Sequence, residues 1–298
     1  MVTSNDIDIQ GVRVTIHAEH PGVTIASDIA RSWLLVPANA PDRFAPPTEA
    51  GVDAVILDLE DAVSAPDKPS ARQRVADWLA AGGRAGTSSL WVRINDATTT
   101  FWADDLAVLA EAPSIAGVML AKTESGSQVE ATADRLPEGT KILALIESAM
   151  GLEAVADIGR ADGTFRLAFG SGDFRRDTGM SDDPMAMAYP RSRLVVASRA
   201  ARLPGPIDGP TLTSNETILQ RDSALTANMG MTGKLCMRPE QAPAVNKGLS
   251  PSAEDIVWAR ETIELLGANG ERVRDGSDLP RLAKAKKFDA LAAAFGLS

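Results

Sequence analysis

Apolar runs of three to eight residues recur along the chain, and stretches with helical spacing of apolar positions separate them. A continuous apolar run that ends at a polar residue is typical of a parallel strand buried on both faces. Eight such units without a long hydrophilic linker predict an α/β fold, a closed (β/α)8 TIM barrel, rather than a doubly wound open sheet. We expect the strands at residues 31–37, 53–60, 90–95, 117–122, 141–148, 166–173, 206–208 and 233–237.

Two segments lie outside these eight units. Residues 1–30 form an N-terminal extension, in which alternation at 12–16 predicts a short edge strand or hairpin. The barrel itself is expected to span residues 31–248. Residues 249–298 form an extra C-terminal helical segment with an amphipathic helix at 252–266, a break at 267–270 and a last helix from Leu279. Because a barrel does not need this segment, we expect it to pack on a neighbouring subunit or to cover the barrel bottom.

The composition of the chain restricts which molecules it can bind and where in the cell we expect it. The net charge of −10 and a pI near 4.8 argue against nucleic acid or an anionic membrane as the main partner. The single cysteine, Cys236, excludes an internal disulfide and fits a reducing compartment. No apolar run has the length of a membrane span, and no basic region precedes an apolar one at the N-terminus. We therefore expect a cytoplasmic protein.

Histidine is almost absent, and this restricts the chemistry. The two histidines, His17 and His20, both lie in the N-terminal extension, where a solvated strand or turn is favoured over a metal site. A Ser-His-Asp hydrolase, a Cys-His protease and a histidine-rich zinc site are excluded in the main body. Acid–base work must then come from carboxylates, lysine, tyrosine, water or the substrate.

Polar residues gather at the predicted strand ends, which all open at one face of a barrel. Glu147 and Asp173 end neighbouring strands and could hold Mg²⁺ with open positions, although a helix cap and a loop turn are the structural alternatives. Arg93 would grip an anionic substrate group bidentately. So many acids side by side need a cation between them. The whole set is Asp58, Glu60, Asp61, Arg93, Asn95, Lys122, Glu124, Glu147 and Asp173.

Two residues near this set have competing interpretations. Lys122 could form a Schiff base, but an ion pair with Glu124 or Asp58 is favoured because the surrounding carboxylates keep the ammonium charged. Asp177 follows Asp173 by four residues. We expect it to anchor Arg175 or Arg176 rather than to act as a second metal ligand.

An ordered set of motifs resembles a known family. The motifs are LLVPANAPDRF at 34–44, AVILDLEDAV at 54–63, VRIN at 92–95, LIES at 145–148, GSGD at 170–173, YPRSRL at 189–194 and GK at 233–234. Over residues 31–290 the chain resembles the HpcH/HpaI aldolase and citrate lyase β-subunit family of CoA-ester lyases, which includes malyl-CoA lyases. The resemblance implies a TIM barrel assembled as a homotrimer or hexamer, with a C-terminal segment that reaches the neighbouring active site.

The same resemblance assigns roles to residues. It implies Mg²⁺ on Glu147 and Asp173, substrate contact by Arg93, and CoA phosphate contact by the loop with Arg43. We place Lys122 and Asp58 with them in the substrate-binding set. The acid–base residue maps to Asp278 of an adjacent subunit, with a helix N-cap as its alternative. Two departures stand out: Arg238 replaces the family's usual histidine, and the C-terminal motif is about two residues shorter than usual.

The resulting functional prediction is an Mg²⁺-dependent carbon–carbon lyase. It would cleave or form a short 3-hydroxy dicarboxylic acyl-CoA ester through a thioester enolate that Arg93 stabilises. Three alternatives remain open at this point. They are a CoA-independent pyruvate or oxo-acid aldolase, an acyl-CoA thioesterase, and a citrate lyase-type subunit that is non-catalytic or depends on a larger complex.

Overall fold

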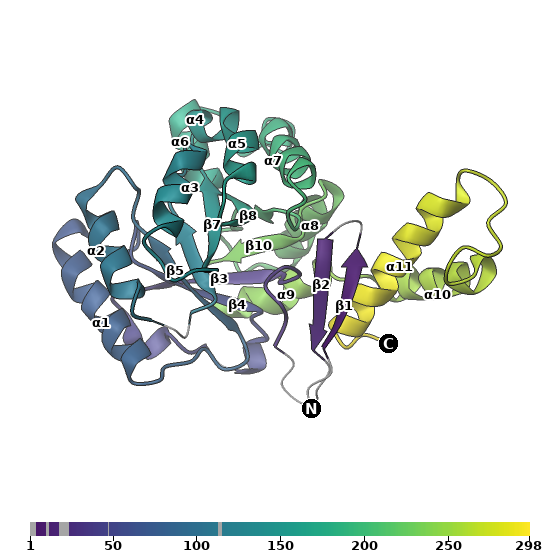
Figure 1. The fold of residues 1–298 in the computed structure, drawn as a ribbon, viewed down its shortest axis with the longest axis horizontal. Coiled ribbons are helices and arrows are strands. Elements are labelled where there is room, and N and C mark those ends of the chain that lie inside the picture. The colour runs from purple at the N-terminus through teal and green to yellow at the C-terminus, as the bar shows by residue number, and fades with distance from the viewer. Residues whose placement is uncertain (1–3, 10–11, 18–23, 47, 113–114) are drawn as a thin grey trace.

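The computed structural model describes residues 4–9, 12–17, 24–46, 48–112 and 115–298, and its centre is a closed barrel of parallel strands (Figure 1). The strands follow one another around the barrel in chain order, and the last pairs with the first. This confirms the predicted TIM barrel. The strands are β3 (Ser32–Pro37), β4 (Ala54–Asp58), β5 (Ser89–Ile94), β6 (Gly117–Leu120), β7 (Lys141–Ile146), β8 (Thr164–Phe169), β9 (Ile207–Asp208) and β10 (Gly233–Cys236).

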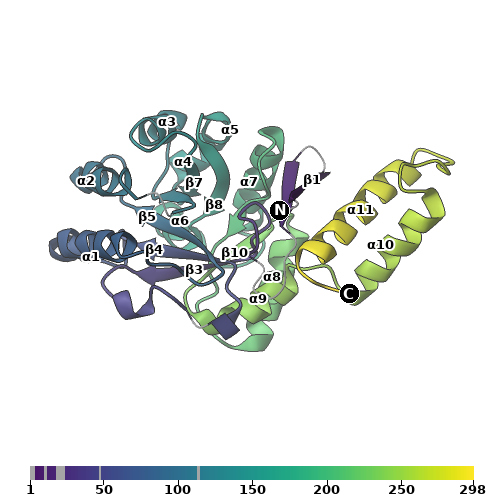
Figure 2. The same ribbon diagram turned by 60° about the horizontal axis from the view of Figure 1, so that its bottom comes forward.

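Helices surround the barrel on the outside (Figures 1 and 2). They are α1 (Lys68–Ala80), α2 (Thr100–Leu109), α3 (Gly126–Ala133), α4 (Ala149–Glu153), α5 (Val155–Arg160), α6 (Ser171–Thr178), α7 (Ala188–Ala200), α8 (Glu216–Asn228) and α9 (Ala242–Gly248). Several predicted strand ends lie one or two residues too late, and the largest error is in β8. The strand expected to reach residue 173 ends at Phe169, and Asp173 lies in the first turn of α6.

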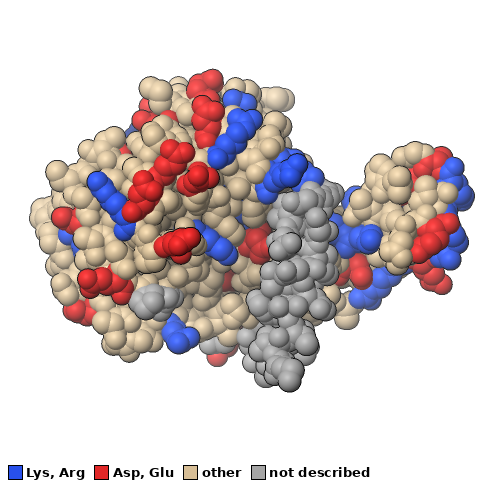
Figure 3. Space-filling model, viewed as in Figure 1, with Lys and Arg blue, Asp and Glu red and all other residues tan. Residues whose placement is uncertain are grey.

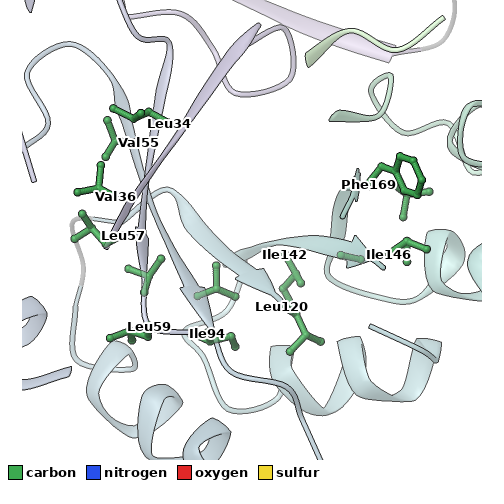
Figure 4. Packing of buried hydrophobic residues seen from close by; sticks show 14 of the residues in the cluster. Leu34, Val36, Val55, Leu57, Leu59, Ile94, Leu120, Ile142, Ile146 and Phe169 are labelled. Carbon is green, nitrogen blue, oxygen red and sulfur yellow. The ribbon is translucent and has the colours of Figure 1, made fainter. Parts of the chain in front are cut away.

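The period of two along each strand divides the core into two layers. Alternate residues such as Trp33, Trp91 and Leu145 fill the barrel interior, where the rings of Trp33 and Trp91 meet edge to face at 5.5 Å. The residues between them point outward against the helices. Figure 4 shows part of this outer layer, including Leu34, Val36, Val55, Leu57, Leu59, Ile94, Leu120, Ile142, Ile146 and Phe169. This alternation decides which side chains can face the barrel axis.

The C-terminal segment is a helical hairpin of α10 (Ala253–Leu266) and α11 (Asp278–Ala294) that projects away from the barrel (Figures 1 and 2). The end of α11 lies against the barrel bottom, where the guanidinium of Arg31 stacks 3.9 Å from the ring centre of Phe295. Arg31 also donates to Asp53 and to Ser250. The loop between α10 and α11 lies at the far end of the hairpin, so Asp278 begins its helix away from the chain's own barrel.

The N-terminal extension contains an antiparallel hairpin of β1 (Ser4–Ile9) and β2 (Val12–His17), as the alternation at 12–16 predicts. Residues 18–23, which include His20, lie outside the described residues. On the face seen in Figure 3, acidic and basic side chains are interspersed over the described part of the barrel surface. Within the described ranges, no helix is long and apolar enough to cross a membrane.

Candidate active site at the carboxyl ends of the strands

Strand alternation aims three of the predicted site residues at the barrel axis. Asp58, Arg93 and Glu147 each stand two positions beyond a side chain of the barrel interior, on β4, on β5 and directly after β7. They therefore continue the inward face of their strands at its carboxyl end, where TIM barrels carry their chemistry. All three side chains are buried. The sequence pattern alone fixes this layer.

Arg93 is held by two carboxylates of the preceding strand unit. Its Nε donates to Asp58 at 2.8 Å and its Nη2 donates to the other oxygen of Asp58 at 2.6 Å. Nη1 lies 3.1 Å from Glu60. Nε and Nη2, the two donors of one edge of the guanidinium, are thus bonded to Asp58, and the predicted bidentate contact with the substrate stays a prediction. Burial lowers the pKa of Arg93, but the charge and hydrogen bonds of Asp58 outweigh it and raise the pKa, so the guanidinium stays charged.

Lys122 is an ion-pair residue, but the predicted partners, Glu124 and Asp58, are wrong. Its Nζ donates to Glu60 and lies 3.4 Å from Asp61 and 4.0 Å from Asp173. Burial lowers the pKa of Lys122, but the hydrogen bond to Glu60 and the charges of the surrounding acids together outweigh it and raise the pKa above its ordinary value. The charged ammonium therefore supplies the cation that the sequence analysis required among these acids.

The backbone of Lys122 has an unusual conformation, with φ of +47°. A positive φ is uncommon outside glycine and costs about 1–3 kcal/mol, and it persists where the surroundings stabilise it. Here the backbone N–H of Lys122 donates to Oε1 of Glu147 at 2.8 Å. The strained residue thus orients the carboxylate that the sequence assigns to metal.

Glu147 lies against a glycine of the next strand unit. A Cβ built on Gly170 would stand 2.4 Å from Oε2 of Glu147, which is closer than any real contact. Burial raises the pKa of Glu147 to about 8. A nearby cation would lower that pKa again. Glycine at 170 is therefore required for Glu147 to occupy its position.

Asp173 completes the acidic group from the first turn of α6. Its Oδ1 lies 3.4 Å from Nη1 of Arg176, while its buried Oδ2 has no hydrogen-bond partner among the described residues. Burial and the neighbouring Asp61 raise the pKa of Asp173. A buried carboxylate oxygen without a partner is costly unless a cation or donor meets it.

This donor set fits Mg²⁺. In the ranges that the structure describes, no group of three or more acidic, histidine or cysteine side chains is arranged as a complete metal cage. Mg²⁺ is commonly bound by one or two carboxylates, with water and substrate oxygens in the other positions. Glu147 and Oδ2 of Asp173, which has no hydrogen bond among the described residues, meet that requirement.

Asp177 and Glu124 have other roles than those expected. Oδ2 of Asp177 accepts the backbone N–H of Ala149 at 2.7 Å and so joins α6 to the start of α4. The expected anchoring of Arg175 or Arg176 by Asp177 is wrong. Glu124 accepts the hydroxyl of Ser148, the N-cap residue of α4. Both acids thus support the first turns of helices at the mouth of the barrel, which is the face where the carboxyl ends of its strands open.

The remaining predicted residues lie farther from the acidic group. Arg43 ends a 3-10 helix after β3, and Arg238 follows β10, which pairs with β3, so the two exposed arginines stand on neighbouring loops of the mouth. In the hairpin, Asp278 accepts the backbone N–H of Arg274 at 3.0 Å, and this bond lowers its pKa. The side chain of Asp278 therefore turns back to the preceding loop and does not cap α11.

Sequence reasoning named Glu60 in the polar set but did not assign it to the site. In the structure Glu60 links Arg93, Lys122 and, through its backbone carbonyl, Nζ of Lys68. Lys68 was missed altogether; it is buried under the mouth and donates also to the carbonyl of Leu59. The dense run Asp58-Leu-Glu60-Asp61 at a strand end was the available signal.

The closed barrel, with acidic side chains that fit a metal ion at the carboxyl ends of its strands, places the protein among TIM-barrel proteins with a carboxylate metal site. The sequence profile of the HpcH/HpaI aldolase/citrate lyase family matches residues 31–239, and the profile of the HpcH/HpaI aldolase C-terminal domain matches residues 254–296. The chain belongs to the HpcH/HpaI aldolase/citrate lyase family, as its motifs predict. The predicted enzyme class, a carbon–carbon lyase or aldolase, is confirmed by that membership.

Three relatives illustrate the similarity. A citrate lyase subunit beta-like protein of Mycobacterium tuberculosis is 35% identical over 240 residues, which cover 78% of this chain and 83% of the relative. The human mitochondrial citramalyl-CoA lyase is 31% identical and covers 78% of this chain and 74% of its own length. The CitE protein of M. tuberculosis, solved with magnesium, acetoacetate and coenzyme A, superposes with a TM-score of 0.73 at 31% identity, over 89% of this chain and 99% of that one.

Proposed function

We propose that this chain is an Mg²⁺-dependent lyase that cleaves or forms a short 3-hydroxy dicarboxylic acyl-CoA ester. One observation carries the proposal: Oδ2 of Asp173, which has no hydrogen bond among the described residues and lies 4.0 Å from Nζ of Lys122, stands in the same mouth as the inward-facing Glu147 and the fixed guanidinium of Arg93. The relatives named for citramalyl-CoA cleavage and the relative solved with magnesium and coenzyme A support the substrate class and the metal.

Glu147 and Asp173 would hold the metal, and the other residues would bind the substrate around it. Bound Mg²⁺ would supply Lewis-acid polarisation of the hydroxyl and carboxylate oxygens of the oxo-acid half. Lys122 and Arg93 contribute fixed positive charge on the same side. Asp58 serves here as the residue that fixes the plane of Arg93.

In the cleavage direction, a base removes the proton of the substrate hydroxyl, and the bond between the carbinol carbon and the α-carbon of the thioester breaks. The electron pair moves onto the thioester as an enolate, and protonation of its carbon gives acetyl-CoA beside the oxo acid. Arg93 stabilises the enolate oxygen, where charge develops. Asp278 of an adjacent subunit is the proposed base, and its lowered pKa keeps it ionised.

Two further assignments belong to the same proposal. The exposed Arg43 would meet the CoA phosphates from its loop after β3. The chain would assemble as a homotrimer or hexamer in which the projecting hairpin of one subunit reaches the mouth of the next (Figure 2). A base on that hairpin cannot serve its own barrel, because α11 begins at the end of the hairpin far from it.

The test is a screen of short dicarboxylic CoA thioesters with Mg²⁺, in which CoA, acetyl-CoA and oxo-acid products are measured. Acetyl-CoA together with an oxo acid supports the proposal. Free CoA without acetyl-CoA means thioester hydrolysis instead. Chelation of Mg²⁺, or Ala at Glu147 or Asp173, should abolish turnover; an active double variant would contradict the metal assignment.

The variant Arg43→Glu separates a CoA-ester lyase from an aldolase of free acids. Loss of this positive charge should raise KM for the CoA ester about tenfold or more, since charge-assisted contacts to phosphate are worth about 1.5–3 kcal/mol. Turnover of a free oxo-acid substrate should remain unchanged. Equal effects on both substrates would contradict the CoA contact.

A further inference from the structure

A cavity of about 710 Å³ lies at the opposite end of the molecule from the catalytic mouth. Its barrel wall comes from residues that precede strands, such as Asp28 and Ile29 before β3 and Thr232 before β10. Its other wall is the last part of α11, including Phe288 and Leu291. The volume is in the range of small-molecule sites in proteins.

Three cations line this cavity: Arg199 at the end of α7, and Lys284 and Lys287 on α11. Within the part of the chain that the structure describes, none of the three has an ion pair with a carboxylate. Lys284 instead lies over the rings of Trp258 and Phe288. Lys287 is half-buried, and burial together with the charge of Arg199 lowers its pKa.

Of the two acids in the cavity lining, one is bonded elsewhere and the other has a raised pKa. Asp255 accepts the backbone N–H of Ser252 and so completes the capping box of α10. Burial raises the pKa of Asp28 above its ordinary value, although the charges of Arg166 and Lys141 act to lower it. Among the residues whose side chains the structure describes, no carboxylate forms an ion pair with Arg199 or Lys287, so the two positive charges repel one another across the junction of barrel and hairpin.

Apolar side chains form much of the remaining wall, among them Leu203, Met231, Leu249, Leu291 and Phe295, with the polar Ser198, Asn228, Thr232 and Ser250 between them. Apolar walls with a few convergent polar groups are typical of ligand sites. We propose that this cavity binds a small organic anion with a short apolar tail, whose charged group lies between Arg199 and Lys287. A carboxylate or a phosphate monoester on an alkyl chain has this chemistry.

Such a ligand would connect two parts of the molecule. Arg199 belongs to the barrel layer and Lys287 to the projecting hairpin, so one anion bound between them fastens α11 to its own barrel. The tail would lie beside Phe295, which already stacks on Arg31. The cavity is separate from the catalytic mouth, so binding is measurable without turnover and independently of the proposed lyase activity.

The experiment is isothermal titration calorimetry of the full chain with sodium hexanoate, with hexyl phosphate, and with 1-hexanol as the uncharged control. We expect one hexanoate per chain with a Kd of about 1 mM or tighter, and at least about tenfold weaker binding of 1-hexanol. The stronger of the two anions identifies the headgroup. Absence of hexanoate and hexyl phosphate binding up to about 20 mM would overturn the proposal.

Matched variants of Lys287 and Lys286 on α11, together with a variant of Arg199 on α7, test the location. Lys287→Met and Arg199→Met should each weaken anion binding about tenfold or more, whereas Lys286→Met, at an exposed position of α11, should leave it within about twofold. Without ligand, Lys287→Met should not lower the melting temperature, because it removes a half-buried charge that has no acidic partner among the described residues. Unchanged binding in Lys287→Met, or equal losses in Lys286→Met, contradicts the site.

Discussion

At the scale of single residues, the mouth depends on how closely two neighbouring strand units approach. Glu147 extends over Gly170, and its other oxygen is fixed by the backbone of Lys122. Neither contact involves a metal ligand other than Glu147 itself. The position of the carboxylate is therefore set by the backbone around it before any cation binds.

Gly170→Ala tests this arrangement. Its φ is −84°, so alanine strains no backbone there and the added methyl group acts only through its clash with Glu147. We expect at least about tenfold weaker Mg²⁺ binding, as for other residues that orient a metal ligand, measured by calorimetry. Gly172→Ala is the matched control, because open space surrounds that position. Equal affinity in the two variants would mean that Gly170 does not position Glu147.

Cys236 gives a second prediction at this scale. It is buried against the helices, and burial raises the pKa of its thiol to about 12. Since the thiolate is the reactive form, about one thiol in ten thousand is ionised at pH 8. A disulfide reagent should leave the folded protein unmodified for hours and label one thiol per chain in guanidinium. Rapid labelling of the native protein would contradict this burial.

The residues of the mouth differ in how far sequence could predict them. The two-residue period of a strand predicts that Asp58, Arg93 and Glu147 all point toward the barrel axis, so the sequence pattern predicts that they lie together. The ion-pair partners of Lys122 could not be predicted from the sequence. Its positive φ redirects the side chain toward Glu60, and that conformation depends on the contacts around it rather than on spacing.

At the scale of elements, β9 is the shortest strand of the barrel, with only Ile207 and Asp208 in the ladder. Asp208 points out of the barrel and accepts from Arg191 on α7, at 2.9 Å, and from Thr226 on α8, at 2.7 Å. Lys234 of β10 lies 3.5 Å from the same carboxylate. Side-chain bonds thus replace the backbone bonds that a longer strand would supply.

Asp208→Ala should therefore destabilise the fold by about 3–5 kcal/mol, because it leaves the buried Lys234 and the half-buried Arg191 without their anion. Asp289→Ala, which removes an exposed pair with Arg260, should cost less than about 1 kcal/mol. Urea unfolding followed by circular dichroism measures both. Comparable losses of unfolding free energy in the two variants would show that the side-chain bonds of Asp208 in β9 have no special role in stability.

The same carboxylate predicts a dependence on pH. Burial raises the pKa of Asp208, but the charges of Lys234 and Arg191 outweigh it and lower the pKa below its ordinary value of 3.8. Its contribution to stability is thus complete above pH 3.8 and is lost as the pH falls through the lower folded value. The difference in stability between wild type and Asp208→Ala should shrink on acidification below pH 3.8.

Element existence was more predictable than element ends. All eight barrel strands were expected, since each buried strand is a continuous apolar run. The end of β8 at Phe169 was not expected, because the residues after Phe169 can continue a strand or start a helix with little difference in local preference. The helix formed, and it carries Asp173 on its first turn beside Asp61 and Lys122.

At the scale of the whole molecule, the barrel and the hairpin have separate functions in our proposal. The barrel mouth holds Glu147, while Asp278 stands at the far end of the hairpin. A single chain then has no complete site of its own. In a closed ring of identical subunits, each mouth would receive the hairpin of its neighbour.

This arrangement predicts complementation between two inactive variants. Asp278→Asn and Glu147→Gln should each lose turnover, the first through its missing base and the second through its missing metal ligand. When the two are co-expressed in equal amounts, a site is complete only if Glu147→Gln supplies the hairpin and Asp278→Asn supplies the barrel. Random assortment in a ring gives about a quarter of the sites this composition, so about a quarter of wild-type turnover should return. Light scattering on the same sample reports the assembly, and mixed oligomers without activity would show that Asp278 does not serve a neighbouring mouth.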